Sequence, residues 1–412
     1  MMARPGVKLG LERRSPLEWG VRALLAASAA WLGYGTISHS LANAVRDSSP
    51  AWAYELAPRD GRIAAAFASH LSGPEATAQD RVRADTIARA ALRRDAIAIP
   101  ALSTLGLNAQ IRGDTVAARS TFAYVQKLTR RDLRTQLWGI EDAVVRGDIP
   151  GVLRQYDLAL RTNKRAGELL YPVLSSAIVE PSVRQELVRM LATKPPWGSD
   201  FVSHVAAASS DPQATVALLS AMRRANIVVP ELANGRVTDA LLTSGNAEAA
   251  WHYYALLHPG VHRQTSRNPR FTERHSAPTQ FDWRSEDDPA LTATLEMSAG
   301  GGRFDFATSP GTGGPVLRQM QVLSPGDYII EGSASVEQTD ASPPYWSLSC
   351  ADGRELGRVD VTPGRDRFTG MVRVPINCPV QMLTLIVQPS ERLMSVAGQV
   401  TQALVRPASV QR

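Results

Sequence analysis

The sequence predicts a multidomain chain with one amino-terminal membrane helix, an array of α-helices and a carboxy-terminal antiparallel β-sandwich of jelly-roll type. Three observations predict this order. A basic amino end precedes a long apolar segment, apolar residues then recur at helical spacing, and beyond residue 281 short β-type runs are separated by Gly, Pro, Asp and Ser. The 412 residues are enough for two or three domains with buried cores.

Composition excludes several classes of protein. Hydrophobic residues make up 44% and charged residues 20% of the chain, which fits neither a disordered chain nor a polytopic membrane protein. Two cysteines are too few for a cysteine-only zinc ribbon, an iron–sulfur cluster or a disulfide-dense scaffold. The net charge of +6 is spread along the chain in short basic pairs, which is typical of solvated helix faces. We therefore expect no nucleic-acid partner.

The amino end predicts membrane targeting. Residues 1–18 carry four basic side chains and form the predicted cytoplasmic tip. Residues 19–42 are apolar over a length that exceeds an ordinary signal-peptide core, so we predict an uncleaved signal anchor that crosses the membrane once. A signal peptide cut after Ala42-Asn43-Ala44 is the alternative. In both cases the positive-inside rule predicts that the rest of the chain is exported.

Residues 51–259 predict amphipathic helices. Within 86–94, for example, Ile87, Ala91 and Leu92 share one side of a helix while arginines occupy the other. Turn-like breaks at 113–114, 147–148, 194–196 and 245–246 divide the region into helices of ordinary length.

Two of these breaks, Gly113-Asp114 and Gly147-Asp148, lie 34 residues apart, and each is followed at matching offsets by a small or β-branched residue and an aromatic residue. The break at 245–246 repeats the second half of the pattern. Close packing of two helices requires the small residue, and the turn requires a residue that tolerates φ > 0. The residues that carry the pattern are Leu105, Gly106, Gly113, Ala118, Phe122, Gly147, Val152, Tyr156, Ala159, Gly245, Ala250 and Tyr254.

This pattern resembles the tetratricopeptide repeat, which implies stacked helix pairs that bind protein partners. The chain departs from that family in lacking the tryptophan of the first helix, in lacking Leu-Gly in the second unit, and in showing no clean copy from 166 to 234. We expect about five or six degenerate pairs at roughly 34 residues each. A generic helical array is the alternative.

Residues 260–280 are rich in arginine and poor in periodic apolar residues, so we predict a linker there, with a linker packed over the next domain as one form of it. Residues 281–408 then carry about nine β-type runs, which predict the sandwich. The predicted strands are 291–297, 302–307, 316–322, 327–336, 345–350, 355–361, 368–374, 380–387 and 394–405.

Both cysteines lie in the predicted sandwich. In an exported chain, Cys350 and Cys378 form the one possible intramolecular disulfide, with two buried thiols as the alternative. The crosslink would close a loop of about 28 residues and stabilise the fold by about 3 kcal/mol in the chain-entropy model.

The last region resembles the carbohydrate-binding-module-like jelly rolls at the end of membrane-anchored repeat proteins in proteobacterial exopolysaccharide clusters. The resemblance lies in Phe281-Asp282-Trp283, in residues 346–350 and in Asn377-Cys378-Pro379. It implies an inner-membrane protein facing the periplasm that acts in polysaccharide production, and it implies no catalytic activity. A sugar platform would use Trp283 and Tyr345 as exposed stacking rings. The sequence favours structural use of these two rings and of Trp346, since aromatic side chains dominate cores.

We expect no catalytic residue, cofactor or metal. The spacing of His252, His258 and His262 does not place a pair on one helix face, and the acidic run 286–288 lacks calcium-loop spacing. The sequence therefore favours a non-enzymatic adaptor that binds protein partners in envelope or exopolysaccharide assembly. The alternative is a polysaccharide-binding protein, or a polysaccharide-modifying hydrolase or lyase. A deep cleft with two carboxylates would favour the enzyme, and a shallow apolar groove would favour the adaptor.

Overall fold

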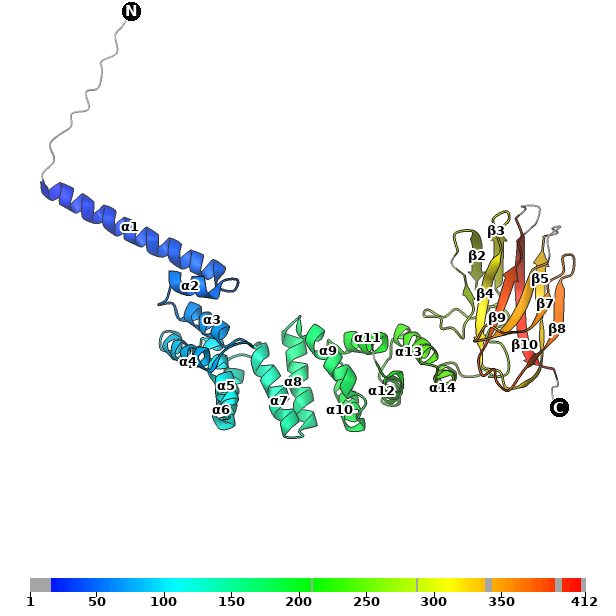
Figure 1. The fold of residues 1–412 in the computed structure, drawn as a ribbon, viewed down its shortest axis with the longest axis horizontal. Helices are drawn as coiled ribbons and strands as arrows, with labels where there is room; N and C mark the ends of the chain where they lie inside the picture. The colour runs from blue at the N-terminus through cyan, green and yellow to red at the C-terminus, as the bar shows by residue number, and fades with distance from the viewer. Residues whose placement is uncertain (1–15, 209, 287, 338–342, 390–394, 409–412) are drawn as a thin grey trace, which may run out of the picture. The chain divides into compact units, whose positions relative to one another are not determined.

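The computed structural model describes residues 16–208, 210–286, 288–337, 343–389 and 395–408. These residues form fourteen helices followed by ten strands, so the predicted order of helices and then an antiparallel β-sandwich is confirmed (Figure 1). Most of the predicted basic tip, Asp287 of the acidic run, and the beginning of the last predicted strand lie outside the described residues. The chain divides into two compact units, Met1–Ala166 and Gly167–Arg412, and each is described by itself.

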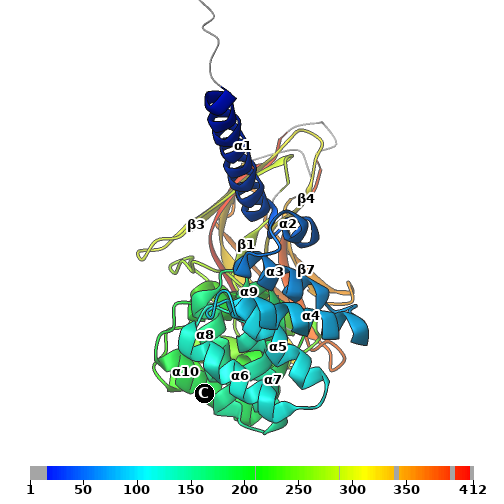
Figure 2. The same ribbon diagram turned by 90° about the vertical axis from the view of Figure 1, so that its left-hand side faces the viewer.

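The first unit contains eight described helices: α1 (Pro16–Val45), α2 (Pro50–Leu56), α3 (Gly61–Leu71), α4 (Ala78–Leu92), α5 (Ile99–Ile111), α6 (Thr115–Leu128), α7 (Leu133–Val145) and α8 (Ile149–Thr162). From α3 onward these helices pack in consecutive pairs, α3 with α4, α5 with α6 and α7 with α8 (Figures 1 and 2).

Helix α1 contains the whole predicted apolar segment 19–42. Near its end Ser38 and Ala42 are buried, and Ala42 packs with residues of α2 and α3. Many of the large apolar side chains of α1 are exposed, including Leu17, Trp19, Val21, Leu24, Leu25, Trp31, Leu32, Tyr34, Ile37 and Leu41. Among the described helices, none combines the length and the mean hydropathy that a membrane crossing requires, so the predicted transmembrane helix is unsupported.

The turns within the helix pairs have the predicted conformation. Gly113 and Gly147 have φ of +84° and +67°, a left-handed conformation that glycine adopts without steric cost. The aspartate after each glycine then caps the next helix, since Asp114 accepts a hydrogen bond from the amide of Ala117 and Asp148 accepts one from that of Gly151.

A small residue is also needed where α5 meets α6. A Cβ atom on Gly106 would lie 2.9 Å from the ring of Phe122, so an alanine there would force the ring to move. Phe122 in turn stacks on Trp138 at a centroid distance of 4.5 Å. Of the other repeat positions in this unit, Ala118, Tyr156 and Ala159 are buried, and Leu105 and Val152 are half-buried.

The second unit begins with six described helices: α9 (Ala166–Ala177), α10 (Pro181–Ala192), α11 (Gly198–Ala208), α12 (Pro212–Arg224), α13 (Glu231–Thr243) and α14 (Ala247–Leu257). Here the packing differs from the first unit, because α10 packs on α12 and α11 packs on α13. The third predicted turn is again left-handed, with Gly245 at φ +80°, and Ala250 and Tyr254 are buried after it.

Two five-stranded antiparallel sheets form the sandwich. One sheet has the order β1-β4-β9-β6-β7 and the other β2-β3-β10-β5-β8, with their inner faces enclosing one hydrophobic core. The strands are β1 (Arg284–Ser285), β2 (Leu291–Glu296), β3 (Arg303–Thr308), β4 (Gly314–Gln321), β5 (Gly326–Val336), β6 (Tyr345–Cys350), β7 (Glu355–Asp360), β8 (Arg367–Val374), β9 (Gln381–Val387) and β10 (Ala397–Pro407).

The predicted linker, 260–280, has no helix or strand, yet it is part of the packed structure. Phe271 is fully buried in the sandwich core. Ser266 and Arg267 are also buried, and the amide of Ser266 donates to the carbonyl of Val405 in β10. The segment therefore covers the sandwich instead of spanning open solvent.

Candidate functional site

An apolar groove lies among helices α10 to α13 of the second unit. Its volume is about 350 Å³, within the range of small binding sites. Its floor is formed by Leu191, Val202 and Met222, which are buried, and by Ile227, which is half-buried. The other lining residues are Ala192, Lys194, Pro195, Gly198, Ser199, Ala225, Asn226, Val228 and Pro230.

Two helix ends shape this groove. At the end of α12 the amide of Asn226 donates to the carbonyl of Arg223, and the amide of Ile227 donates to the carbonyl of Met222, both at 2.9 Å. With Asn226 at φ +56°, this is a Schellman cap, which ends the helix and packs Ile227 against Met222. Lys194, at φ +53°, ends α10 in the same left-handed conformation. Both chain reversals therefore direct apolar residues to one groove.

The described lining of the groove carries one charged side chain. Among its described lining residues Lys194 alone is charged, and it is exposed. No ion pair or side-chain hydrogen bond ties the Lys194 ammonium to another described residue. Val228, on the connection between α12 and α13, also lines the groove and is 88% exposed. The groove thus combines unpartnered apolar surface with one free cation among the described residues.

The second unit also contains a buried charged side chain, Arg267, which is only 4% exposed. Its guanidinium donates to the carbonyl of Phe281 at 3.0 Å, to Oε1 of Gln321 at 2.9 Å and to the carbonyl of Met320. It also lies over the rings of Trp251 and Phe281, at 5.7 and 5.5 Å from their centroids. Burial lowers the pKa of Arg267 to about 10. These contacts fasten α14 and residues 260–280 to the sandwich.

Next to Arg267, Asp282 accepts three hydrogen bonds. The hydroxyl of Tyr254 donates to Oδ1 at 2.7 Å, and the amide and hydroxyl of Thr279 donate to Oδ2 at 2.7 and 2.9 Å. Burial, together with the charge of Asp282, raises the pKa of Tyr254 well above its usual value. Because both carboxylate oxygens are engaged within the fold, Asp282 holds the junction together and is poorly placed to exchange protons with a substrate.

Two histidines lie beside this junction. His258 packs edge-to-face on His275 with 4.5 Å between ring centroids. Burial, and then the charge of His275, lower the pKa of His258. His275 also lines a cavity of about 540 Å³ whose one described carboxylate-bearing residue is Asp282. That cavity therefore lacks the pair of carboxylates that glycoside hydrolysis uses.

The residues predicted to contact glycan lie in different environments. Trp283 is 3% exposed, its Nε1 donates to the carbonyl of Asn268, and its ring packs against Phe271 and Trp346. Trp283 is therefore not an exposed stacking ring, because it completes the sandwich core. Tyr345 is half-buried and the guanidinium of Arg358 lies 5.2 Å above its ring.

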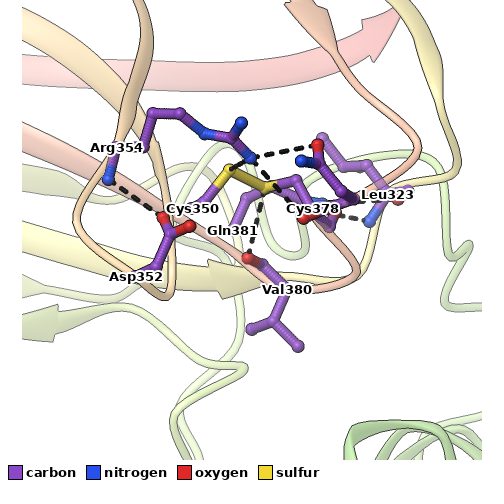
Figure 3. The surroundings of a disulfide bond; sticks show 8 residues. Leu323, Cys350, Asp352, Arg354, Cys378, Val380 and Gln381 are labelled. Carbon is purple, nitrogen blue, oxygen red and sulfur yellow. Dashed lines mark hydrogen bonds between the residues drawn. A yellow bond between two sulfur atoms is a disulfide. The ribbon is translucent and has the colours of Figure 1, made fainter.

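The predicted disulfide is confirmed. Cys350 at the end of β6 and Cys378 before β9 are joined, with a sequence separation of 28 and Cα atoms 5.6 Å apart. Figure 3 shows the guanidinium of Arg354 beside the two sulfurs, where it donates to Oδ1 of Asn377 at 3.1 Å. Gln381 lies on the other side and accepts from the amide of Leu323 (Figure 3). The crosslink therefore ties two strand ends of one sheet.

The other predicted chemical candidates are dispersed. His252 is exposed and pairs with Glu248, and Glu286 pairs with Arg318 at 2.8 Å. Within the described ranges, no three His, Cys, Asp or Glu side chains converge in a way that could hold a metal ion.

The groove itself was missed by sequence reasoning, because it lies in the stretch where the repeat pattern fades. The available signals were the prolines at 195 and 230, which follow helix ends. A counterpart of the Leu105-Gly106 pair in the second repeat, with its glycine eight residues before Gly147 where Gly106 stands seven before Gly113, was also missed. It is Trp138-Gly139, where a Cβ on Gly139 would lie 3.0 Å from the side chain of Gln155.

Comparisons with known proteins concern part of the chain. No family model matches it, and no curated protein matches it. Among solved structures, TmCBM61 in complex with β-1,4-galactotriose is similar over 30% of this chain and 88% of its own, with 17% identity and a TM-score of 0.23. A CBM4 structure is similar over 36% and 99%, with 13% identity and a TM-score of 0.26. At scores this low, these likenesses carry no argument about a ligand of this chain.

Proposed function

We propose that this protein is a non-enzymatic adaptor that attaches to the bacterial inner membrane and binds protein partners in cell-envelope or exopolysaccharide assembly. The observation that carries the proposal is the apolar groove of α10 to α13. Its described lining is mostly apolar, with Lys194, Ser199 and Asn226 as the polar residues, and it contains no described carboxylate. Such a surface suits side chains of a partner protein and lacks the acid and base that a hydrolase or lyase requires.

The periplasmic location is supported by the disulfide, since such crosslinks persist in oxidising compartments. Membrane attachment is supported by α1. Its exposed Trp19, Trp31 and Tyr34 are of the residue types that lie at a membrane interface, and basic residues precede it in the sequence. Alkaline carbonate extraction of membranes from cells making the full chain distinguishes the modes of attachment. A spanning helix stays with the membrane, an interfacial helix is released, and a chain found only in the soluble fraction before extraction refutes membrane attachment.

A second candidate function is polysaccharide binding by the sandwich. It is favoured by the half-buried ring of Tyr345, which lies in β6 in register with Ile386 of β9 and beside the Ser347–Thr384 pair. Ser347 is buried, so a partly exposed aromatic ring with the Thr384 hydroxyl nearby is the feature that suits a sugar ring. Retention of the full-length protein on immobilised exopolysaccharide, lost in Tyr345→Ala, would favour this function over the adaptor.

Photo-crosslinking in living cells tests the adaptor function. A benzoylphenylalanine residue replaces Ser199, which lines the groove and is exposed, and a control places it at Ala207, which is exposed on the same helix outside the groove. We expect a discrete crosslinked envelope protein from position 199 and none from position 207. The absence of any product from position 199, or the same product from both positions, would contradict the proposal.

A further inference from the structure

In the connection between α12 and α13, several backbone amide and carbonyl groups form no hydrogen bond with another described residue. Residues 227–230 belong to no helix or strand. The amide of Ile227 is used in the cap of α12, and the carbonyl of Pro230 accepts from α13. Within the part of the chain that the structure describes, the amides of Val228 and Val229 and the carbonyls of Ile227 and Val228 have no hydrogen-bond partner. This short stretch is therefore an open backbone edge, in which Val228 directs its hydrogen-bonding groups to one side and Ile227 and Val229 direct theirs to the other when the chain is extended.

This open edge borders the groove. Ile227 and Val228 both line it, so a chain that paired with the edge would have its own side chains next to the apolar floor. An exposed edge that carries large apolar side chains is the feature to which another extended chain adds as a strand. Main-chain hydrogen bonds then supply affinity, and the groove selects the side chains.

The charge of Lys194 indicates which charge a segment bound in the groove should carry. Lys194 lies at the rim of the groove, on the α10 to α11 connection, and has no carboxylate partner among the described residues. A bound segment with a carboxylate would complement this charge, whereas a basic segment would be repelled. The groove thus distinguishes an acidic apolar chain from a basic one.

We infer that the groove binds an extended, apolar segment of a partner protein that carries an acidic side chain. The segment adds as a strand to residues 227–229, places its apolar side chains over Met222 and Val202, and brings its carboxylate to Lys194. This inference rests on the proposed adaptor function and names the chemistry of its partner. No covalent step is involved.

Fluorescence anisotropy with the full-length protein in detergent tests the inference. The probes are fluorescein-labelled heptapeptides of alternating valine and leucine with one glutamate at the first, middle or last position, each with a lysine-containing counterpart. We expect at least one glutamate peptide to bind more tightly than its counterpart. In Lys194→Glu the preference should reverse, each exposed charge contact being worth up to about fivefold in affinity.

Two further measurements test separately the main-chain hydrogen bonds of the peptide and its position in the groove. N-methylation of two alternate peptide amides removes main-chain hydrogen bonds and should weaken binding by about tenfold or more, without any change in the protein. Ser199→Trp fills the groove from an exposed position and should abolish binding, whereas Ala207→Trp should leave it unchanged. These are the results that the geometry requires.

Several outcomes would overturn the inference. They are the failure of every glutamate peptide to bind at high micromolar concentration, equal binding of glutamate and lysine peptides to the wild-type protein, or full binding of the N-methylated peptide. If the peptides fail while position 199 still crosslinks an envelope protein in cells, the inferred peptide chemistry is wrong and the adaptor function stands. If both fail, the adaptor function is wrong as well.

Discussion

Arg267 offers the sharpest test of how the last helix is fastened to the sandwich. The perturbation is Arg267→Met, which keeps an unbranched apolar stem and removes the guanidinium. Three hydrogen bonds from the charged group are lost, to the carbonyls of Phe281 and Met320 and to the side chain of Gln321. At about 1.5 to 3 kcal/mol for each charged hydrogen bond, the gross loss is on the order of 5 to 9 kcal/mol.

Burial of the guanidinium offsets part of that loss. The lowering of the Arg267 pKa from 12.5 to about 10 corresponds to about 3 kcal/mol of desolvation that methionine would not incur. The net expectation is a decrease of about 2 to 6 kcal/mol in the free energy of unfolding, in the range measured when one partner of a buried polar network is removed. The effect should be confined to the second unit, which contains all of these contacts.

The assay is urea unfolding of the full-length protein followed by tryptophan fluorescence, with Trp251 next to Arg267 as one reporter. Arg270→Met is the matched control, because Arg270 is exposed in the same segment and should change stability by about 0.5 kcal/mol or less. If Arg267→Met unfolds at the same urea concentration as Arg270→Met, the claim that residues 260–280 fasten α14 to the sandwich is refuted.

Three other predictions concern the interior of the two units. Gly106→Ala should destabilise the first unit by about 1 to 3 kcal/mol, because the added Cβ lies 2.9 Å from Phe122, and a thermal midpoint equal to wild type would contradict this packing. Replacing both Cys350 and Cys378 by serine should cost about 3 kcal/mol, and a reducing agent should lower the unfolding midpoint of the wild-type protein and leave the double variant unchanged. Burial raises the pKa of Tyr253 to about 12, so its neutral form is favoured in the folded state. Stability from this group is present below pH 10 and should fall as the pH rises from about 10 to about 12, more steeply in wild type than in Tyr253→Phe.

Turns, strands and the disulfide could be predicted well, because they depend on residues close in sequence or on composition. The positive φ of Gly113, Gly147 and Gly245 follows from local turn chemistry, which a single sequence carries. The sandwich strands follow from period-two alternation and turn residues, and the disulfide follows from there being only two cysteines. These are short-range or composition-level signals.

Features that depend on tertiary packing could not be predicted. Arg267 lies in a segment whose basic composition indicates solvent exposure, yet acceptors from β4 and the rings of α14 and Phe281 bury it. For Trp283 the sequence left a sugar contact and a structural role both open, because aromatic residues near a domain entry are ambiguous without knowledge of the core that covers them. The break at 194–196 was predicted, but the turn at Asn226 carries no glycine to mark it, and a single sequence does not show that these two connections meet at one groove.

The claim that the α10 to α13 groove receives a partner chain is tested most directly by hydrogen–deuterium exchange. The full-length protein is measured alone and in complex with the partner that crosslinks at Ser199. In the free protein the amides of Val228 and Val229 should exchange rapidly, because they have no acceptor among the described residues. In the complex the exchange of one of these two amides should slow markedly, because one added strand pairs with the groups on one side of the segment. A complex that protects other segments and leaves residues 227–229 exchanging as fast as in the free protein would contradict the claim.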